Sequence, residues 1–329
     1  MRARIRDKRG IPMKLLAWLS RPEYIFRPSQ IVRRLMYELR PSRTQYQTVT
    51  LPWGLDIRVQ QKEVVGSGIR RLGVHELATS ECICRLIEPG ELSVDVGANI
   101  GHMTSIMAMQ AGPSGQVISF EPHPVLYKEL QYNVTAWKQN PNIAPITTYN
   151  VALSNNVGSA RLAVPADYES NHGVCSIADN TEDSSTTTYF EVAVTTLTAI
   201  IEQNRQISFL KIDVEGHELM VLKGAESLLA SGQIRDILFE EHGTLPTPVT
   251  TLLQGHGYQL YRILNGLFGL TLIPIDTYHA PLVEHDSPNF LATRSPGRLL
   301  GKTSKRGWIV YSKKWGRRSQ PTPVTSLAN

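Results

Sequence analysis

The sequence predicts an α/β fold in which helices cover both faces of a mostly parallel β-sheet. Apolar, β-branched runs alternate with helical patterns along the middle of the chain, which is the order of elements that parallel sheets use. These runs are apolar throughout, as is typical of strands buried on both faces. With 329 residues, of which 41% are hydrophobic and 19% charged, the chain is long enough to bury one large core.

Five runs form the predicted strands of this sheet. In chain order they are LSVDVGA from Leu92, VISFEP from Val117, ITTYNVALS from Ile146, ISFLKIDVEG from Ile207 and DILFEEHG from Asp236. Three helices are predicted between them from helical spacing and first-turn signals. Their inward faces carry Met103, Ile106 and Met107 in the first, Leu126, Leu130 and Val134 in the second, which begins near Pro124, and Leu219, Leu222, Ala225 and Leu229 in the third, which begins near Glu218.

The two ends of the chain differ from this middle part. Residues 1–46 read as a basic arm with two short amphipathic helices, followed by the strand-like QTVTLPWGLDIRVQ. Residues 298–329 read as a basic tail with a short strand at GWIVYS. We therefore predict an arm (1–46), a main domain (47–297) and a tail (298–329). The polar residues 165–190 are expected to form a loop or lid with strand at its edges.

Charge is divided unevenly between these regions. The net charge is +5, but residues 1–46 hold twelve Lys/Arg against three acids and residues 295–329 hold eight against none, so the residues between them are acidic. Basic ends can contact an anionic membrane surface or a partner protein. The acidic middle and the lack of a recognition motif disfavour a specific nucleic acid. The oligomeric state is not indicated by the sequence.

Cysteine spacing and hydropathy indicate the cellular compartment of the protein. Cys82, Cys84 and Cys175 form no C-x-x-C pair, so reduced and mostly buried thiols are expected rather than a disulfide framework or a zinc site. The longest apolar stretch, ILNGLFGLTLIPI, is interrupted by glycine and proline and is too short to cross a bilayer. MKLLAWLS is shorter than the apolar region of a signal peptide. These patterns predict a cytoplasmic protein.

The segment DVGANIG, which starts at Asp95, is the first indication of a ligand site. A glycine turn from a strand into a helix lets a ligand approach the backbone N–H groups. The second and third glycines of the dinucleotide fingerprint are missing after Gly97, and an acid so near would repel phosphate but suit a cation. Glu121, at the end of the next strand, is placed to accept both hydroxyls of a ribose. Together they predict S-adenosyl-L-methionine, a nucleoside with a cationic amino-acid part.

Six motifs strengthen this interpretation: VDVGANIG, FEPHP, NVALSNNVG, FLKIDVEGHELMVLKGA, ILFEEH and NFLATRSP. In this order they resemble the FkbM-type methyltransferases from about Gly73 to Ser295, and KIDVEGHE is the most specific of them. The resemblance implies a class I methyltransferase (Rossmann-like) sheet of seven strands, the last antiparallel, and methyl transfer from S-adenosylmethionine, usually to a hydroxyl. It implies cofactor binding by Asp95, Gly97, Asn99, Gly101 and Glu121, and we predict that Ala98 and Ala152 belong to the same site. Thr198 departs from the family, which often has Asp there, but it can still cap a helix.

The catalytic candidates lie where the fourth and fifth predicted strands end. A methyl acceptor must be aligned with the methyl group, and a base must take its hydroxyl proton. Asp213 is the first candidate for this base, His242 the second and Glu215 the third, because burial and neighbouring acids displace carboxyl pKa values. A magnesium site built from Asp213, Glu240 and Glu241 is an alternative, but we predict no metal.

The sequence therefore predicts an S-adenosylmethionine-dependent O-methyltransferase that acts on a sugar, a glycan or another small hydroxylated metabolite. A nicotinamide-dependent oxidoreductase on a similar sheet remains open, although the missing glycines disfavour it. A non-catalytic module that docks through its basic ends is the alternative from another class. The identity of the acceptor cannot be derived from any motif.

Overall fold

The computed structural model describes residues 22–26, 30–31, 44–60, 63–164, 176–177, 187–277 and 289–311. Within them, the main element is an eight-stranded sheet with the order β13-β12-β14-β11-β10-β3-β4-β5. Its strands are β3 (Leu92–Val96), β4 (Gln116–Phe120), β5 (Ile146–Tyr149), β10 (Ile207–Ile212), β11 (Ile234–Glu240), β12 (Gln259–Gly266), β13 (Gly269–Pro274) and β14 (Asn289–Thr293). Strands β5, β4, β3, β10 and β11 are parallel, and β14 is antiparallel to β11.

This topology confirms the predicted class I methyltransferase fold, with an antiparallel last strand inserted beside β11. The sheet has eight strands rather than the expected seven. The additional strand is β13, because the chain turns back after β12 and pairs with it as an antiparallel hairpin. The longest apolar stretch of the sequence thus forms a sheet edge. In the part of the chain that the structure describes, no helix has the length and apolar character needed to cross a membrane.

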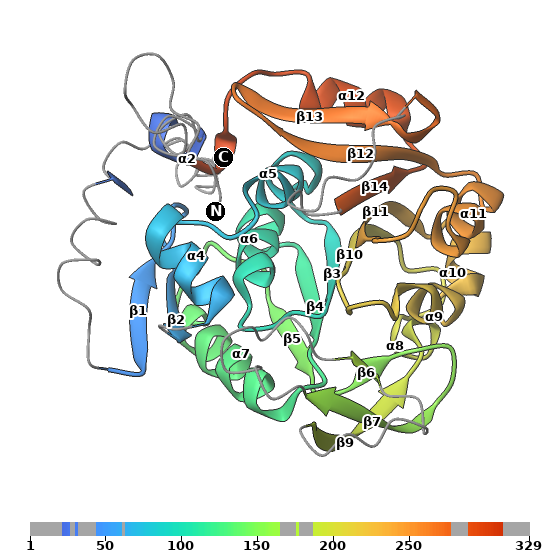
Figure 1. The fold of residues 1–329 in the computed structure, drawn as a ribbon, viewed down its shortest axis with the longest axis horizontal. Helices are drawn as coiled ribbons and strands as arrows, with labels where there is room; N and C mark the ends of the chain where they lie inside the picture. Colours follow the sequence, from blue (N-terminus) through green and yellow to red (C-terminus); the bar gives the residue numbers. More distant parts are fainter. Residues whose placement is uncertain are drawn as a thin grey trace, which may run out of the picture.

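Helices cover both faces of the main sheet (Figure 1). On one side are α4 (Val64–Leu72), α5 (Leu77–Leu86), α6 (His102–Ala111), α7 (Pro124–Trp137) and α12 (Pro296–Thr303); on the other are α8 (Leu197–Ile200), α9 (Glu218–Lys223), α10 (Glu226–Ala230) and α11 (Pro248–Gly255). Each side has its own cluster of buried apolar side chains. The inward faces predicted for the first two helices, around Met103 and Leu126, are buried as expected.

The third predicted helix is broken into α9 and α10. The break lies at Gly224, where a Cβ atom would come within 1.9 Å of the carbonyl oxygen of Ser154, so only glycine allows this approach. Thr198 Oγ1 donates a hydrogen bond of 2.9 Å to the Gly224 carbonyl. The cap of α8 is Thr196, whose hydroxyl accepts from the backbone N–H of Ala199. Thr198 therefore stabilises the break, and the expectation that it caps the helix was wrong.

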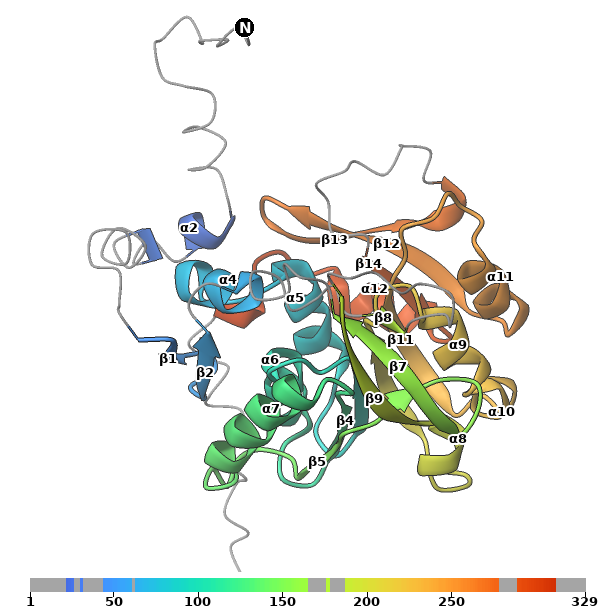
Figure 2. The ribbon, with the colours of Figure 1, turned by 60° about the horizontal axis from the view of Figure 1, so that its bottom comes forward.

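Two smaller sheets flank the main one. A hairpin joins β1 (Tyr46–Thr50) to β2 (Asp56–Gln60), as the strand-like sequence there predicted. A four-stranded sheet has the order β6-β9-β7-β8, formed by β6 (Ala152–Leu153), β9 (Thr188–Thr195), β7 (Gly158–Val164) and β8 (Ser176–Ile177). Figure 2 shows it as a layer separate from the main sheet. The run ITTYNVALS is therefore divided between β5 of the main sheet and β6 of the smaller one.

The start of the expected basic tail is folded rather than extended. Residues Pro296–Thr303 form α12 and Ile309–Tyr311 form the 3-10 helix η2, where a strand was expected. Arg85 of α5 donates 2.7 Å to the Gly307 carbonyl, and Glu81 accepts from two backbone N–H groups of η2. Since the buried Arg85–Glu81 pair needs these partners, it ties this segment to α5.

Several predictions fall on other parts of the chain. The short helix α2 (Pro22–Phe26) lies within the expected arm. Most of the two helices predicted for that arm lies outside the described residues, and so does most of the segment 165–190. The 3-10 helix η1 (Ile275–Thr277) follows β13. Cys82 and Cys84 are free and buried as predicted, whereas Cys175 lies outside the described residues. The division into arm, domain and tail remains a prediction.

Candidate functional site

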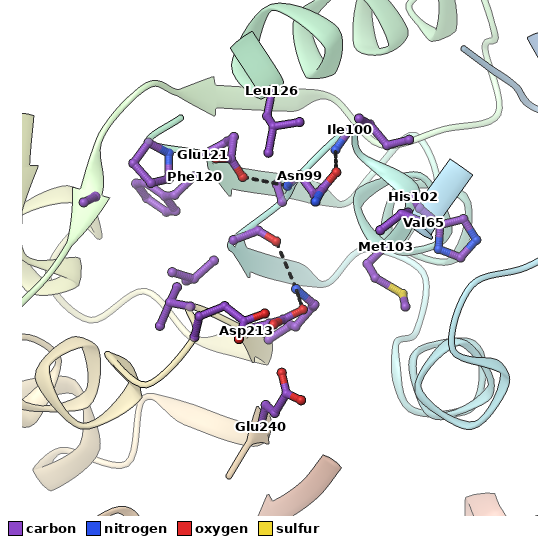
Figure 3. Close-up of a pocket in the computed structure, with 18 of the residues that line it drawn as sticks. Val65, Asn99, Ile100, His102, Met103, Phe120, Glu121, Leu126, Asp213 and Glu240 are labelled. Carbon is purple, nitrogen blue, oxygen red and sulfur yellow. Dashed lines mark hydrogen bonds and ion pairs between the residues drawn. The ribbon is translucent and has the colours of Figure 1, made fainter. Parts of the chain in front are cut away.

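A cavity opens where the strand order reverses, between β3 and β10. The chain continues from β3 to β4 on one side and from β10 to β11 on the other, and such a reversal creates a crevice at the carboxyl ends of parallel strands. The cavity is drawn in Figure 3. Of the predicted site residues, those that line it are Gly97, Ala98, Asn99, Glu121, Ala152, Asp213 and Glu215, whereas Asp95, Gly101 and His242 do not.

The turn after β3 brings two strand ends into backbone contact. Gly97 has a φ of 76°, and a Cβ there would lie 1.9 Å from the Asp213 carbonyl oxygen. Asn99 is also left-handed, with a φ of 52°, and its Oδ1 accepts from the N–H of Ile100 at 2.8 Å. Gly101 is left-handed as well, with a φ of 93°, and a Cβ there would also lie 2.8 Å from the Leu130 side chain of α7. Both glycines of the motif therefore allow a left-handed turn and a close approach.

Glu121 connects this turn to the end of β4. Its Oε2 accepts from the N–H of Asn99 at 2.8 Å and its Oε1 from the N–H of His123 at 2.9 Å. The side chain is largely buried, and burial raises the pKa of Glu121 to about 7 against the effect of both hydrogen bonds. A carboxylate has about four acceptor sites, so capacity for two further donors remains at the cavity wall.

Asp95 lies beneath the turn rather than in the cavity wall. It is fully buried in β3, where Oδ2 accepts from Thr104 Oγ1 at 2.6 Å and Oδ1 is 3.4 Å from Lys211 Nζ. Burial raises the pKa of Asp95, although Lys211 and Thr104 act in the opposite direction. Its contacts support the turn from below, and direct contact with a ligand remains a prediction.

Several acids lie close together at the carboxyl ends of β10 and β11. The Asp213 side chain is 34% exposed and its Oδ2 lies 3.2 Å from Lys211 Nζ. Burial raises the pKa of Glu240 to about 9, with a further contribution from Asp213. Glu215 has a left-handed φ of 51°, and burial together with Asp213 and Glu218 raises its pKa to about 7. His242 lies outside this group, with 65% of its side chain exposed and Nε2 3.3 Å from Glu240 Oε1.

Lys211 is a site residue that the sequence interpretation missed. It lines the cavity, its side chain is 3% exposed, and it contacts both Asp95 and Asp213. A signal for it exists in the sequence, because it stands between Leu210 and Ile212 in an apolar strand. A buried lysine needs an acidic partner. What the sequence lacks is the information that this partner is on β3.

The contacts do not support the suggested magnesium site of Asp213, Glu240 and Glu241. Glu241 is turned toward α11, where its carboxylate accepts from Thr247 Oγ1 at 2.8 Å and from the N–H of Gly243 at 3.1 Å. The residues whose candidate ligand atoms lie within 4.8 Å of one another are Glu215, Glu240 and His242. Exposed acidic groups commonly lie this close without an ion, so proximity alone does not define a metal site.

Comparison with known proteins gives the family. A sequence profile described as "Methyltransferase FkbM domain" matches residues 95–260, half of the chain. The chain belongs to the FkbM methyltransferase family. It is 28% identical over 246 residues to the 31-O-demethyl-FK506 methyltransferase FkbM of Streptomyces tacrolimicus, covering 64% of this chain and 89% of that protein. It is 27% identical over 187 residues to the hexuronic acid methyltransferase AglP of Haloferax volcanii, covering 55% and 70%.

Solved structures are more distant. The crystal structure of methyltransferase FkbM from Methylobacillus flagellatus is 17% identical, with a TM-score of 0.37, over 71% of this chain and 56% of that one. A SAM-dependent O-methyltransferase from Thermotoga maritima is 15% identical, with a TM-score of 0.39, over 67% and 65%. Scores this low support no conclusion about the site. Family membership favours methyl transfer over the oxidoreductase that the sequence left open.

The cofactor of this FkbM methyltransferase is S-adenosyl-L-methionine, and the cavity has the chemistry to hold it. Glu121 offers carboxylate oxygens at the end of β4, where a ribose binds in related sheets. Asp213, Glu215 and Glu240 make the other side acidic, which suits a ligand with a sulfonium and an ammonium group. A pyrophosphate would meet these same acids, and Lys211, which also lines the cavity, already pairs with Asp95 and Asp213. The residues present therefore fit this cofactor.

Proposed function

We propose that this methyltransferase transfers the methyl group of S-adenosylmethionine to a hydroxyl oxygen of a sugar, a glycan or another small hydroxylated molecule. The observation that carries the proposal is the placement of Asp213, which reaches the cofactor cavity at the end of β10 with its carboxylate beside Lys211. The names of the two relatives, an O-demethyl-FK506 methyltransferase and a hexuronic acid methyltransferase, support an oxygen-rich acceptor.

Each side of the cavity has a separate task in this proposal. When bound, S-adenosylmethionine supplies an electrophilic methyl group on its sulfonium sulfur. Glu121 binds the ribose hydroxyls, and the backbone of the turn at Gly97 packs against the cofactor. The carboxylate of Asp213 accepts the proton of the acceptor hydroxyl, so that the oxygen becomes a better nucleophile while it is held in line.

His242 and Glu215 remain the second and third candidates for this base. His242 is mostly exposed and lies against Glu240, so it could take a proton from an acceptor that enters from solvent. Glu215, with its pKa raised to about 7, could do so near neutral pH. Asp213 is preferred because it is nearer to the turn that binds the cofactor: the Gly97 position touches the backbone of Asp213.

The acceptor is proposed to enter beside the smaller sheet. Leu162 of β7 and Ala152 of β6 line the cavity, and residues 165–190, most of which lie outside the described residues, follow β7 directly. This side of the cavity would therefore select the acceptor. A cytoplasmic location and contact of the basic ends with a membrane or a partner protein also remain proposals, and neither affects the chemistry of the site.

Two measurements, made one after the other, test the proposed function. Calorimetry with S-adenosylhomocysteine, the product without the methyl group, should show one site per chain, and absence of binding together with binding of NAD(H) would favour an oxidoreductase. Methyl-labelled S-adenosylmethionine should then label an acceptor among uronic acids, oligosaccharides and polyketide alcohols. Label on a nitrogen or carbon atom of the product would contradict O-methylation.

A further inference from the structure

Lys211 joins the two sides of the cavity through one ammonium group. Nζ donates to the Gly97 carbonyl at 3.1 Å and lies 3.4 Å from Asp95 Oδ1 and 3.2 Å from Asp213 Oδ2. The ammonium group, which carries three N–H donors, therefore faces one backbone carbonyl and two carboxylates. Gly97 and Asp95 belong to the turn that binds the cofactor, and Asp213 belongs to the acids around the acceptor.

The strand register makes this contact a property of the sheet. Lys211 of β10 is directly opposite Asp95 of β3. Its neighbours Leu210 and Ile212 point to the opposite face of the sheet, where they are buried among apolar side chains. Because the Lys211 side chain is only 3% exposed, water cannot stabilise its charge, and the two carboxylates must do so.

We infer that Lys211 is a positioning residue for methyl transfer, which holds the cofactor turn against the end of β10 and keeps Asp213 the ionised member of the Asp213–Glu240 pair. This inference rests on the proposed function, since it takes Asp213 as the base. It assigns to Lys211, the first residue of the KIDVEGHE motif, the choice of which acid carries a proton.

The surroundings of Asp213 explain why Lys211 decides this choice. Burial alone would raise the pKa of Asp213, but the charge and hydrogen bond of Lys211, with a hydrogen bond from Glu240, lower it. Among the described residues no Lys or Arg pairs with Glu240, whose basic neighbour is the exposed His242 ring at 3.3 Å, and burial and the negative charge of Asp213 raise the pKa of Glu240 to about 9. At neutral pH the proton is therefore on Glu240, which donates to Asp213. The other titratable groups that face the pair are Glu76, Glu215, Glu218, Asp95, His75 and His242.

The test compares Lys211→Met with Lys211→Arg in the full chain, with Lys223→Met on the exposed face of α9 as the control. The rate of label transfer from methyl-labelled S-adenosylmethionine is measured from pH 5 to 9 with the acceptor that the labelling experiment identifies. In Lys211→Met the pKa of Asp213 rises, so the acid limb of the profile should move to higher pH by about one to three units. Lys211→Arg should keep the wild-type limb, because it restores the charge, and Lys223→Met should change nothing.

A purely structural role would give a different result. If Lys211→Met lowered the rate equally at all pH values and left the acid limb in place, the inference would be overturned. Calorimetry with S-adenosylhomocysteine distinguishes failure of this inference from failure of the proposed function. A wild-type protein that neither binds this probe nor transfers label would overturn the function itself.

A second variant covers the case in which Lys211→Met does not fold. Glu240→Gln replaces the protonated acid by a neutral group that still donates to Asp213. It should keep the acid limb of the pH profile where the wild type has it, whereas Glu240→Ala should move this limb to higher pH because Asp213 loses a donor. Loss of activity in Glu240→Gln with S-adenosylhomocysteine binding intact would show that Glu240 acts as an ionised group and would overturn the inference.

Discussion

Buried acids lie at both ends of the main sheet, but their surroundings differ. At the amino end, Asp236 is fully buried and accepts from Thr293 Oγ1 at 2.6 Å, while Arg235 and Arg298 each approach it to 3.0 Å. At the carboxyl end, Lys211 pairs with Asp95 and Asp213, and burial leaves other acids of the cavity with raised pKa values.

This difference in surroundings distinguishes an acid that stabilises the fold from acids that are placed to bind a ligand. A carboxylate surrounded by guanidinium groups and a hydroxyl has its bonding capacity filled, so it stabilises the strands that it joins. Acids that share a cavity with too few cations store repulsion, which a cationic ligand relieves. Such undercompensated groups are a common mark of functional sites. Four changes can break or sharpen this comparison.

The largest effect is expected from Asp213→Asn at the carboxyl end. Loss of the base should reduce the transfer rate by about 10²–10⁴-fold, with little change in the affinity for S-adenosylhomocysteine, because the cofactor turn is retained. Glu226→Gln on exposed α10 is the control. The rate is measured by label transfer and the affinity by calorimetry. An Asp213→Asn protein with near-wild-type turnover would assign the base to His242 or Glu215.

The matching change at the amino end is Asp236→Asn. It leaves two guanidinium groups without their shared anion and should lower the free energy of unfolding by about 3 kcal/mol. The folded fraction should bind S-adenosylhomocysteine as the wild type does. Urea unfolding measures the stability, with the exposed Asp276→Asn as the control. If the variant instead lost ligand affinity without losing stability, the amino end would not be the structural region proposed here.

The pH dependence of stability should originate at the carboxyl end. Glu121 and Glu215 each have a pKa raised to about 7 in the fold, against about 4.3 when unfolded. The folded state therefore holds extra protons, and the stability that they contribute is complete below about pH 4.3 and is lost as the pH rises through about 7. Glu215→Gln should flatten this decline in cofactor-free protein. An unchanged slope in urea unfolding from pH 5 to 8 would contradict the assignment.

The smallest effect is expected at the surface of the amino end. Lys302 of α12 pairs with Glu88, and both side chains are about two-fifths exposed. Such a pair contributes about 0–1 kcal/mol because water and salt screen it. Lys302→Met should therefore change the free energy of unfolding by less than about 1 kcal/mol and leave methyl transfer unaltered. A larger loss would show that the stability of this region does not depend mainly on Asp236.

Local patterns predicted much of this protein. The strand ends at Asp95, Glu121 and Asp213 could be located because each follows an apolar run whose period and length are typical of a buried strand. The helix from Pro124 was predicted with its inward face because its apolar residues repeat at helical spacing. These signals arise within a few residues of the chain, where sequence distance and spatial distance are nearly the same.

Predictions failed where a distant segment changes a local preference. The helix expected from Glu218 is interrupted at Gly224 because the backbone of Ser154 lies against it. The strand expected at GWIVYS is instead a 3-10 helix, in a segment whose backbone is bound by Arg85 and Glu81 of α5. Neither partner can be recognised from the local sequence, since both lie far away along the chain.

The sequence by itself determined the fold class, the glycine turn at Gly97, the strand-end acid Glu121 and the set of acids from which a base could come. Only the tertiary structure decided their relation. The register of β10 against β3 places Lys211 opposite Asp95 and within reach of Asp213. An ion pair between strands depends on pairing partners that are more than a hundred residues apart, and no periodicity within either strand records that pairing.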